Sequence, residues 1–445
     1  MALLASEPVM LAHSSLATSD IAVSACLLAL VYHFATNREA GPFRRIGLPA
    51  LWLAAAVLCK ASGLVFGPLC LVAVELERCL SQRTANIPLE ADWRCRLGMR
   101  SPWMRRFLKD ATCIVAGGLL LVILYCGGSE GSGRASLIAW CDHVPPGPVR
   151  TAAAWTTQHA PFPNNAVDGL YFQIQHNFKA GEGTYLLGNY YPAGQALWYY
   201  FPLALTMKLS LTSLGLMLLL AATRPRSLAN WAMAAAAALL LFSLTCRVQI
   251  GVRYMLPLIA LGTVGLAAAV VQSWQSFRAV WPKWLLAAAA GVGVAWSVAA
   301  AVVVWPNGLC YTNELWGGTE RGYLCLSDSN YDWGQGLKEL AIWHEQNGAP
   351  LDVCYFGSDP DIHKLGIRAL TLEKMPLEGP DGMLTQIRGH FLAVSTTALY
   401  GHPASLTKCA AFLRQRQPVD RTSTFLIYDF THEVEAAGLA RGPLP

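Results

Sequence analysis

The sequence predicts a polytopic α-helical membrane domain over 1–305, followed by a small extracytoplasmic α/β domain over 306–445. Of the 445 residues, 54% are hydrophobic and only 14% are charged, and the mean hydropathy is +0.36. Soluble domains carry about 25% charged residues, so this chain has too few to cover a water-facing surface. The long apolar runs lie almost entirely before residue 306. We therefore expect an integral, multi-pass membrane protein and exclude a disordered or wholly soluble chain.

Most of the apolar runs approach the length that crosses a bilayer, which is about 20 residues for a helix. These runs are 21–36, 107–125, 203–222, 229–245, 255–272 and 284–305. A further stretch, 47–75, is interrupted at Lys60–Gly63 and has arginines on both flanks. Lysine and arginine mark cytoplasmic loops, so we expect a helical hairpin whose turn points toward the outer side.

The same charge rule orients the rest of the chain. It makes 126–198 a long outer loop and leaves the tail outside the membrane. The 13 cysteines contain no CxxC pair, and several lie in apolar runs, which indicates neither a metal site nor a disulfide framework. A single bridge outside the membrane stays open. The net charge of +5 is small for this length, so we expect no nucleic-acid partner.

The tail has the pattern of a small α/β layer. Four short apolar runs predict strands, at Tyr323–Ser327, Asp352–Phe356, Phe391–Ser395 and Thr424–Tyr428. Helical spacing separates them, over Trp333–Gln346 and Ser405–Arg416. Alternating strands and helices favour parallel pairing.

Ionisable side chains gather at one predicted level of the membrane domain, the outer ends of its helices. The group comprises Asp20, Lys60, Lys208, Arg247 and Arg253. Charges in spanning segments are costly and usually face a cavity or a partner. The opposite, cytoplasmic ends of the helices are expected to hold no comparable group.

This group of charges suits an anionic, lipid-linked substrate. Lysine and arginine neutralise phosphate, and arginine does so with bidentate geometry. A carboxylate such as Asp20 can accept or orient the proton of an acceptor hydroxyl as the phosphate leaves. Simpler roles stay open: Asp20 as a helix cap, Lys60 and Lys208 extending to the membrane interface, and the two loop arginines contacting headgroups.

A polar motif in the tail, Asp328–Gln335, has two interpretations. Its alternating Asp and Asn residues are typical of an Asx turn that also caps the next helix. Alternatively the loop folds over the membrane cavity, with Trp333 stacked on a sugar and Asp332 or Gln335 hydrogen-bonding it.

Several motifs occur in order over 8–335. They are Pro8–His13 with Leu16–Asp20, Leu58–Lys60, Tyr185–Gly188 with Trp198–Pro202 and Lys208, Gly251–Pro257, and Tyr311–Glu314 with Asp328–Gln335. Together they resemble the lipid-carrier-dependent glycosyltransferases of the C-type membrane fold. That group includes protein O-mannosyltransferases and lipid A aminoarabinose transferases (glycosyltransferase family 39 and relatives).

The resemblance implies a C-type helical bundle and a hexosyl or pentosyl transfer, with inversion, from a polyprenyl-phosphate-type donor. The acceptor would be a protein, lipid or glycan on the extracytoplasmic face of a bacterial-type inner or plasma membrane. Asp20 matches an acidic position near the metal or acceptor. Lys60, Lys208 and Arg253 match phosphate-facing positions, and Tyr254 completes the Arg-Tyr-x-Leu-Pro motif. We expect no cofactor, with a divalent metal left open because metal use varies among these enzymes.

The chain departs from the family pattern at its start. Family members begin with another spanning helix and a first outer loop that carries the principal acidic residue. Here only Glu7 precedes Asp20, in a context that does not fit. We expect an N-terminally truncated transferase. The alternatives are a relative that binds lipid phosphate without transferring sugar, or a membrane transporter, which the lack of matching broken helices in two halves disfavours.

Overall fold

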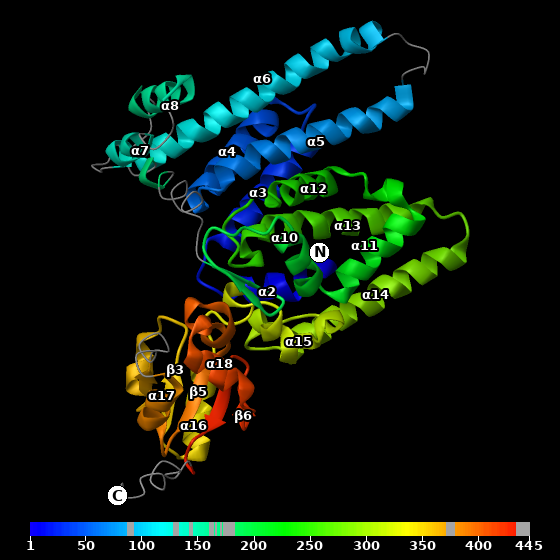
Figure 1. Cartoon of the computed structure of the whole chain (residues 1–445). Coiled ribbons are helices and arrows are strands. Elements are labelled where there is room, and N and C mark those ends of the chain that lie inside the picture. Colours follow the sequence, from blue (N-terminus) through cyan, green and yellow to red (C-terminus); the bar gives the residue numbers. More distant parts are fainter. Residues whose placement is uncertain are drawn as a thin grey trace, which may run out of the picture. The chain divides into compact units, whose positions relative to one another are not determined.

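A computed structural model of the chain is mostly helical, with a small sheet near the C-terminus (Figure 1). It describes residues 1–86, 93–127, 133–141, 146–159, 164, 167–169, 171, 183–370 and 379–432. The chain forms two compact units. Unit 1 comprises 1–181, 210–248 and 253–299, and unit 2 comprises 182–209, 249–252 and 300–445. Two short segments from the expected membrane domain thus pack with the tail, where the sequence predicts a single boundary after residue 305.

The helices of unit 1 account for most of its described residues. They are α1 (Ala2–Ala5), α2 (Pro8–Ser14), α3 (Asp20–Thr36), α4 (Leu48–Cys59), α5 (Gly63–Asn86), α6 (Trp93–Cys126), α7 (Gly133–Cys141), α8 (Pro148–His159), α11 (Leu211–Thr223), α12 (Trp231–Ser243), α13 (Leu256–Ser276) and α14 (Val280–Val303). Helices α3, α4, α5 and α6 lie beside one another, and α12 packs on α13 (Figure 1).

Three helices among the described residues are long and apolar enough to cross a membrane. They are Trp103–Cys126, which is part of α6, Val252–Ser276, which contains α13, and Val280–Val303, which is α14. These correspond to the predicted spans 107–125, 255–272 and 284–305. The predicted spans 21–36 and 229–245 form shorter apolar helices, α3 with 17 residues and α12 with 13.

Two interrupted helices differ in how well the sequence predicts them. The break expected in 47–75 is present, because α4 ends at Cys59 and α5 begins at Gly63. The prediction of one straight helix over 203–222 is wrong. The chain there forms α10 (Tyr200–Lys208) and α11, which meet at an angle of 111°. The Ser210 side chain caps α11 by accepting from the Ser213 N–H at 3.2 Å, so a new helix starts there.

The remaining elements of unit 2 form two sheets and their covering helices. The strands are β1 (Thr184–Leu186), β2 (Asn189–Tyr191), β3 (Leu351–Cys354), β4 (Arg368–Leu370), β5 (Phe391–Ser395), β6 (Asp420–Arg421) and β7 (Phe425–Asp429). The helices are α15 (Gly318–Arg321), α16 (Leu337–Asn347), α17 (Gly379–Ile387) and α18 (Lys408–Gln415). Strands β1 and β2 form an antiparallel hairpin.

The larger sheet is mixed, with the order β4-β3-β5-β7-β6. Strands β4, β3 and β5 are parallel, as the sequence predicts, whereas β5, β7 and β6 pair antiparallel. Three of the predicted strands are present as β3, β5 and β7. The fourth prediction, Tyr323–Ser327, is wrong because that run begins with a 3₁₀ turn at Gly322–Leu324.

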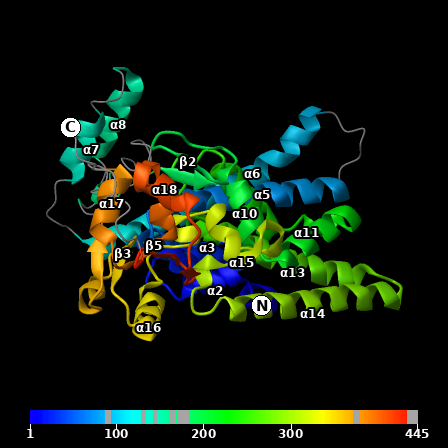
Figure 2. The same cartoon turned by 60° about the horizontal axis from the view of Figure 1, so that its bottom comes forward.

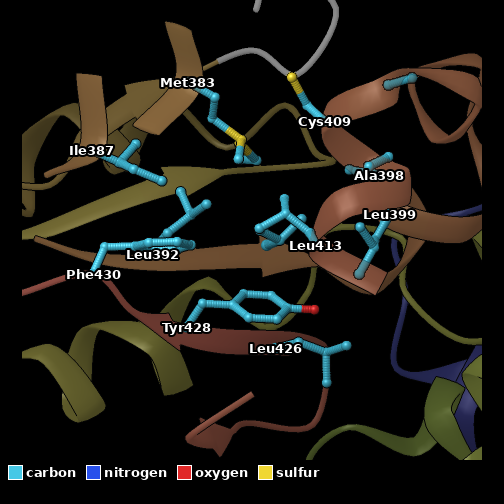
Figure 3. Packing of buried hydrophobic residues seen from close by; sticks show 14 residues of the cluster. Met383, Ile387, Leu392, Ala398, Leu399, Cys409, Leu413, Leu426, Tyr428 and Phe430 are labelled. Carbon is cyan, nitrogen blue, oxygen red and sulfur yellow. The ribbon is translucent and has the colours of Figure 1, made fainter. Parts of the chain in front are cut away.

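Helices cover both faces of this sheet, so unit 2 contains a three-layer α/β core (Figure 2). On one face α17 and α18 pack through Met383, Ile387, Cys409 and Leu413 against β5 and β7 (Figure 3). On the other face α16 packs through three apolar side chains against β3 and β7. Successive side chains of a strand point to opposite faces, so β5 and β7 contribute buried residues to both layers of packing.

Candidate functional site

Asp20 and Lys60, which are 40 residues apart in sequence, form an ion pair in unit 1. The Lys60 ammonium donates to Asp20 Oδ1. Asp20 begins α3 and is 3% exposed, and Lys60 follows the last residue of α4. A carboxylate at a helix N-terminus and an ammonium at a helix C-terminus both interact favourably with the helix dipoles. Ser19 is the N-cap residue, and its side chain makes no capping bond.

Tyr254 joins a second cation to this pair. Lys60 Nζ lies 4.4 Å from the centroid of the Tyr254 ring, and Arg253 Cζ lies 5.2 Å from the same centroid. Both Arg253 and Tyr254 belong to a 3₁₀ turn, Val252–Met255, immediately before α13. A cation over an aromatic face is attracted by the ring quadrupole, so Tyr254 helps to hold both positive charges near one carboxylate.

We call Asp20, Lys60, Arg253 and Tyr254 the Lys60 cluster. With one carboxylate, one ammonium and one guanidinium, it carries a formal charge of +1. Four of the residues that the sequence singles out are thus brought together. Arg247 is exposed between α12 and the 3₁₀ turn, and in the described part of the chain no hydrogen bond or ion pair ties it to the cluster.

Lys208 has a different environment from the one expected. It lies at the end of α10 in unit 2 and is 2% exposed. Its ammonium donates to the carbonyl oxygens of Leu309 (2.8 Å), Asn330 (2.7 Å) and Tyr311. An ammonium has three protons, so these contacts occupy all of them. The geometry favours a structural role for Lys208 over a phosphate contact, and the predicted phosphate-binding group is divided between the two units.

Asn330 is a residue whose importance the sequence does not reveal. Besides accepting from Lys208 through its carbonyl, it accepts from the Val252 N–H at 2.8 Å and donates to the Tyr200 hydroxyl at 2.8 Å. The next residue back, Ser329, donates to the Ile250 carbonyl at 2.7 Å. In the sequence Asn330 belongs to the Asp328–Gln335 motif, whose alternating Asp and Asn residues indicate a turn rather than these long-range partners.

Asp332 and Gln335 bind within their own loop and to the end of β5. Asp332 is 1% exposed, accepts from the Gly334 N–H at 3.1 Å, and also accepts from the Ser395 hydroxyl and the Thr397 N–H (3.0 Å). Burial raises the pKa of this carboxyl. Gln335 accepts from the Trp333 N–H and donates to a backbone carbonyl, each at 2.8 Å. The Asx turn is thus confirmed, but Asp332 does not cap α16, whose N-cap is Gly336.

Trp333 lines a cavity of about 600 Å³ in unit 2. The other lining residues follow β3, β4 or β5 or lie at their ends: Cys354, Tyr355, Phe356, Gly357, Ser358, Leu370, Ala398, His402 and Ala404. Asp332 and Gln335 do not line it. Of the three tail residues predicted to contact a sugar, Trp333 is therefore the one that lines this cavity.

A second buried charge cluster contradicts the expectation that the opposite helix ends hold none. Arg38 contacts Glu75 at 2.6 Å and Asp110 at 3.2 Å, and Arg45 Nε donates to Asp110 at 2.9 Å. Asp110 and Glu75 are 0% and 2% exposed. Two acids inside the apolar helices α5 and α6 are the signal that could have revealed it. The arrangement ties these helices to the end of α3.

Glu7 binds the start of α11. Its carboxylate accepts from the Ser210 N–H at 2.8 Å and from the hydroxyls of Ser210 (2.9 Å) and Ser213 (2.6 Å). These contacts place it outside the Lys60 cluster. Among the described residues there is no group of three or more His, Cys, Asp or Glu side chains that could hold a metal ion.

Among the described residues, the groups that the sequence singles out thus contribute to the Lys60 cluster in unit 1 and to an aromatic cavity in unit 2. Comparison of the chain with protein-family models, with curated proteins and with solved structures finds no match in any of the three.

Proposed function

We propose that this protein is a membrane glycosyltransferase that takes a sugar from a polyprenyl-phosphate-type lipid and transfers it on the extracytoplasmic side of a bacterial-type inner or plasma membrane. The single observation that carries the proposal is the Lys60 cluster. It combines a carboxylate with two cations at the ends of apolar helices. Three helices among the described residues are suitable for crossing a membrane and support the lipid-bound setting. A C-type helical bundle around the cluster is part of the proposal.

The cations of the cluster suit the phosphate of the donor. The Asp20 contact uses one of the three protons of the Lys60 ammonium, so the same group can also donate to a phosphate oxygen. Arg253 adds a guanidinium that contacts the same Tyr254 ring, and arginine binds phosphate with two parallel hydrogen bonds. Their combined charge stabilises the lipid phosphate as it leaves with the electron pair of the broken sugar–oxygen bond.

The carboxylate of the cluster suits the acceptor. As the acceptor hydroxyl oxygen bonds to the anomeric carbon, its proton passes to Asp20. The Lys60 ammonium occupies that carboxylate in the unliganded chain, and a bound phosphate draws the ammonium toward the donor. Proton acceptance is thereby linked to an occupied donor site.

A second function is favoured by the composition of the cluster. Its single carboxylate is already paired with Lys60, and Glu7 is engaged by Ser210 and Ser213. A site with two cations and no available base would bind a lipid phosphate without transferring sugar. The two functions share the phosphate contacts and differ in the role of Asp20.

The test measures binding and transfer separately on the full chain in lipid nanodiscs. Binding is measured with undecaprenyl phosphate by native mass spectrometry. We expect Lys60→Met and Arg253→Met each to weaken it about tenfold, because each removes one phosphate contact. The matched control is Arg278→Gln, at an exposed arginine in the α13–α14 connection.

Transfer is measured with undecaprenyl-phosphate-linked radiolabelled sugars and a membrane extract as the source of acceptor. Under our proposal Asp20→Asn abolishes transfer and leaves binding of undecaprenyl phosphate intact. Binding with no transfer by the unaltered chain supports the second function instead. Both functions are overturned if Lys60→Met and Arg253→Met bind the lipid as the unaltered chain does.

A further inference from the structure

The aromatic cavity of unit 2 lies where the order of the parallel strands reverses. The chain passes from β3 to β4 on one side and then returns to β5 on the other side of β3. The β3–β4 connection packs Ile362 and Ile367 on the face that α16 covers, and α17 of the β4–β5 connection packs on the opposite face (Figure 2). In open α/β sheets, ligands bind beyond the carboxyl ends of the strands at such a point.

The cavity is located at those carboxyl ends. Cys354 is the last residue of β3 and Leu370 the last of β4, while Ala398 follows the end of β5 by three residues. Its volume of about 600 Å³ falls within the usual range for small-molecule sites, about 300–1,000 Å³. The sheet therefore positions the cavity independently of the Lys60 cluster, which belongs to unit 1.

Two glycines let the loops beside the cavity meet. Gly334 has a φ of +86°, and a Cβ atom there would lie 2.7 Å from Gly357 Cα. The Tyr355 hydroxyl donates to the Gly334 carbonyl at 2.6 Å and closes the contact. Trp333, adjacent to Gly334, is held beside the loop that follows β3.

The lining of the cavity indicates an uncharged ligand. Its aromatic rings come from Trp333, Tyr355, Phe356 and His402, and Ser358 adds a hydroxyl. The described lining residues include no Asp, Glu, Lys or Arg. The segment after β3 leads to a 3₁₀ turn, Pro360–Lys364, rather than to an α-helix N-terminus that would bind phosphate.

From these observations we infer that the cavity is a binding site for a neutral saccharide. A pyranose ring has an apolar C–H face, which stacks on an aromatic side chain, and hydroxyls that pair with polar groups around it. Rigid aromatic rings with a few polar atoms are the lining that such a ligand needs. The inference depends on unit 2 alone and stands whether or not the Lys60 cluster transfers sugar.

The experiment is saturation-transfer NMR on the full chain in nanodiscs, titrated with mannose, galactose, N-acetylglucosamine and diacetylchitobiose. Glucuronate and uridine monophosphate serve as charged comparators. We expect saturable binding of at least one neutral sugar, weakened about tenfold by Trp333→Ala because one stacking surface is lost. Trp316→Ala, at another half-buried tryptophan of unit 2 outside the cavity, is the matched control.

A second pair of variants keeps the test valid if Trp333→Ala disturbs the loop. Ser358 is exposed at the cavity, so Ser358→Phe fills part of the space without burying a new group, and Ser358→Ala leaves the space open. We expect the phenylalanine to block sugar binding and the alanine to preserve it. Lys60→Met preserves it too, which separates this site from the proposed transfer site.

Three results would overturn the inference: no saturable binding of any neutral sugar, binding that is equal in the Ser358→Phe and unaltered chains, or tighter binding of either charged comparator. The last result assigns the cavity to an anionic ligand.

Discussion

Lys208 and Lys60 are both lysines at helix ends, and from the sequence we expect both to contact phosphate. In the structure the first donates to three backbone carbonyls and the second to a carboxylate. The Asp20–Lys60 pairing could be anticipated, because opposite charges in apolar segments gain by meeting. The Lys208 contacts could not, because backbone carbonyls occur at every residue and leave no pattern in a sequence.

The contacts of Lys208 predict a large loss of stability on its removal. Lys208→Met leaves three buried carbonyls without their donor, and we expect it to lower the free energy of unfolding by about 3 kcal/mol. Lys338→Met, at an exposed lysine of the same unit, should change it by less than about 0.5 kcal/mol. Denaturant titration in mixed micelles measures both. A stable Lys208→Met chain that no longer binds undecaprenyl phosphate would instead support the phosphate role expected from the sequence.

Among the elements, the bend between α10 and α11 is the clearest departure from the predicted pattern. The apolar run through 203–222 has no Pro or Gly at the break, so hydropathy alone indicates one helix. The break is stabilised by Asn313, which pairs carbonyls that have no partner where α10 ends. Its side chain donates to the carbonyls of Thr206 (2.7 Å) and Leu209 (2.9 Å). A partner about 100 residues away in the chain thus ends the helix.

Removing the Asn313 amide should therefore destabilise unit 2. Asn313→Leu leaves two carbonyls unpaired, and we expect a loss of about 2 kcal/mol in the free energy of unfolding. Asn347→Leu is the matched control, because the Asn347 side chain also donates to a carbonyl, at 2.8 Å, but lies exposed where water can replace it. The capping role is refuted if the two variants lose equal stability in the same denaturant titration.

The strands of the tail show what a short pattern can and cannot predict. Phe391–Ser395 is predicted to the residue, because its continuous apolar run is buried on both faces. The run at Tyr323–Ser327 is similarly apolar but follows Gly322, where a Cβ atom would lie 2.2 Å from the Thr312 hydroxyl. Strands β4 and β6 have three and two residues, too few for any periodicity.

For the molecule as a whole, α14 gives the strongest support for a membrane environment. Only 11% of its apolar window is buried, against 61% for the span that contains α13. Exposed tryptophans mark its ends, with Trp281 and Trp284 near the start and Trp305 just beyond the last turn. The 21 residue steps from Trp284 to Trp305, of which all but the last two lie within α14, extend about 30 Å at 1.5 Å per residue, the thickness of the hydrocarbon core.

The proposed orientation places the tail and the α11–α12 connection on opposite sides of the membrane. An epitope inserted after Gly348, in the exposed turn that ends α16, should be reached by antibody from outside sealed cells. An epitope inserted after Arg226, also exposed, should be reached only in inverted vesicles. Access to both epitopes from one side would refute the orientation and remove the extracytoplasmic setting of the proposed transfer.

The Asp20–Lys60 pair also imposes an order on biosynthesis. A ribosome adds about 5–20 residues per second, so Lys60 is made about 2–8 s after Asp20, its partner 40 residues earlier. During that interval the carboxylate at the start of α3 lacks the cation that it contacts in the folded chain. The first residue of α3 can therefore reach its final environment only after all of α4 and Lys60 have been synthesised.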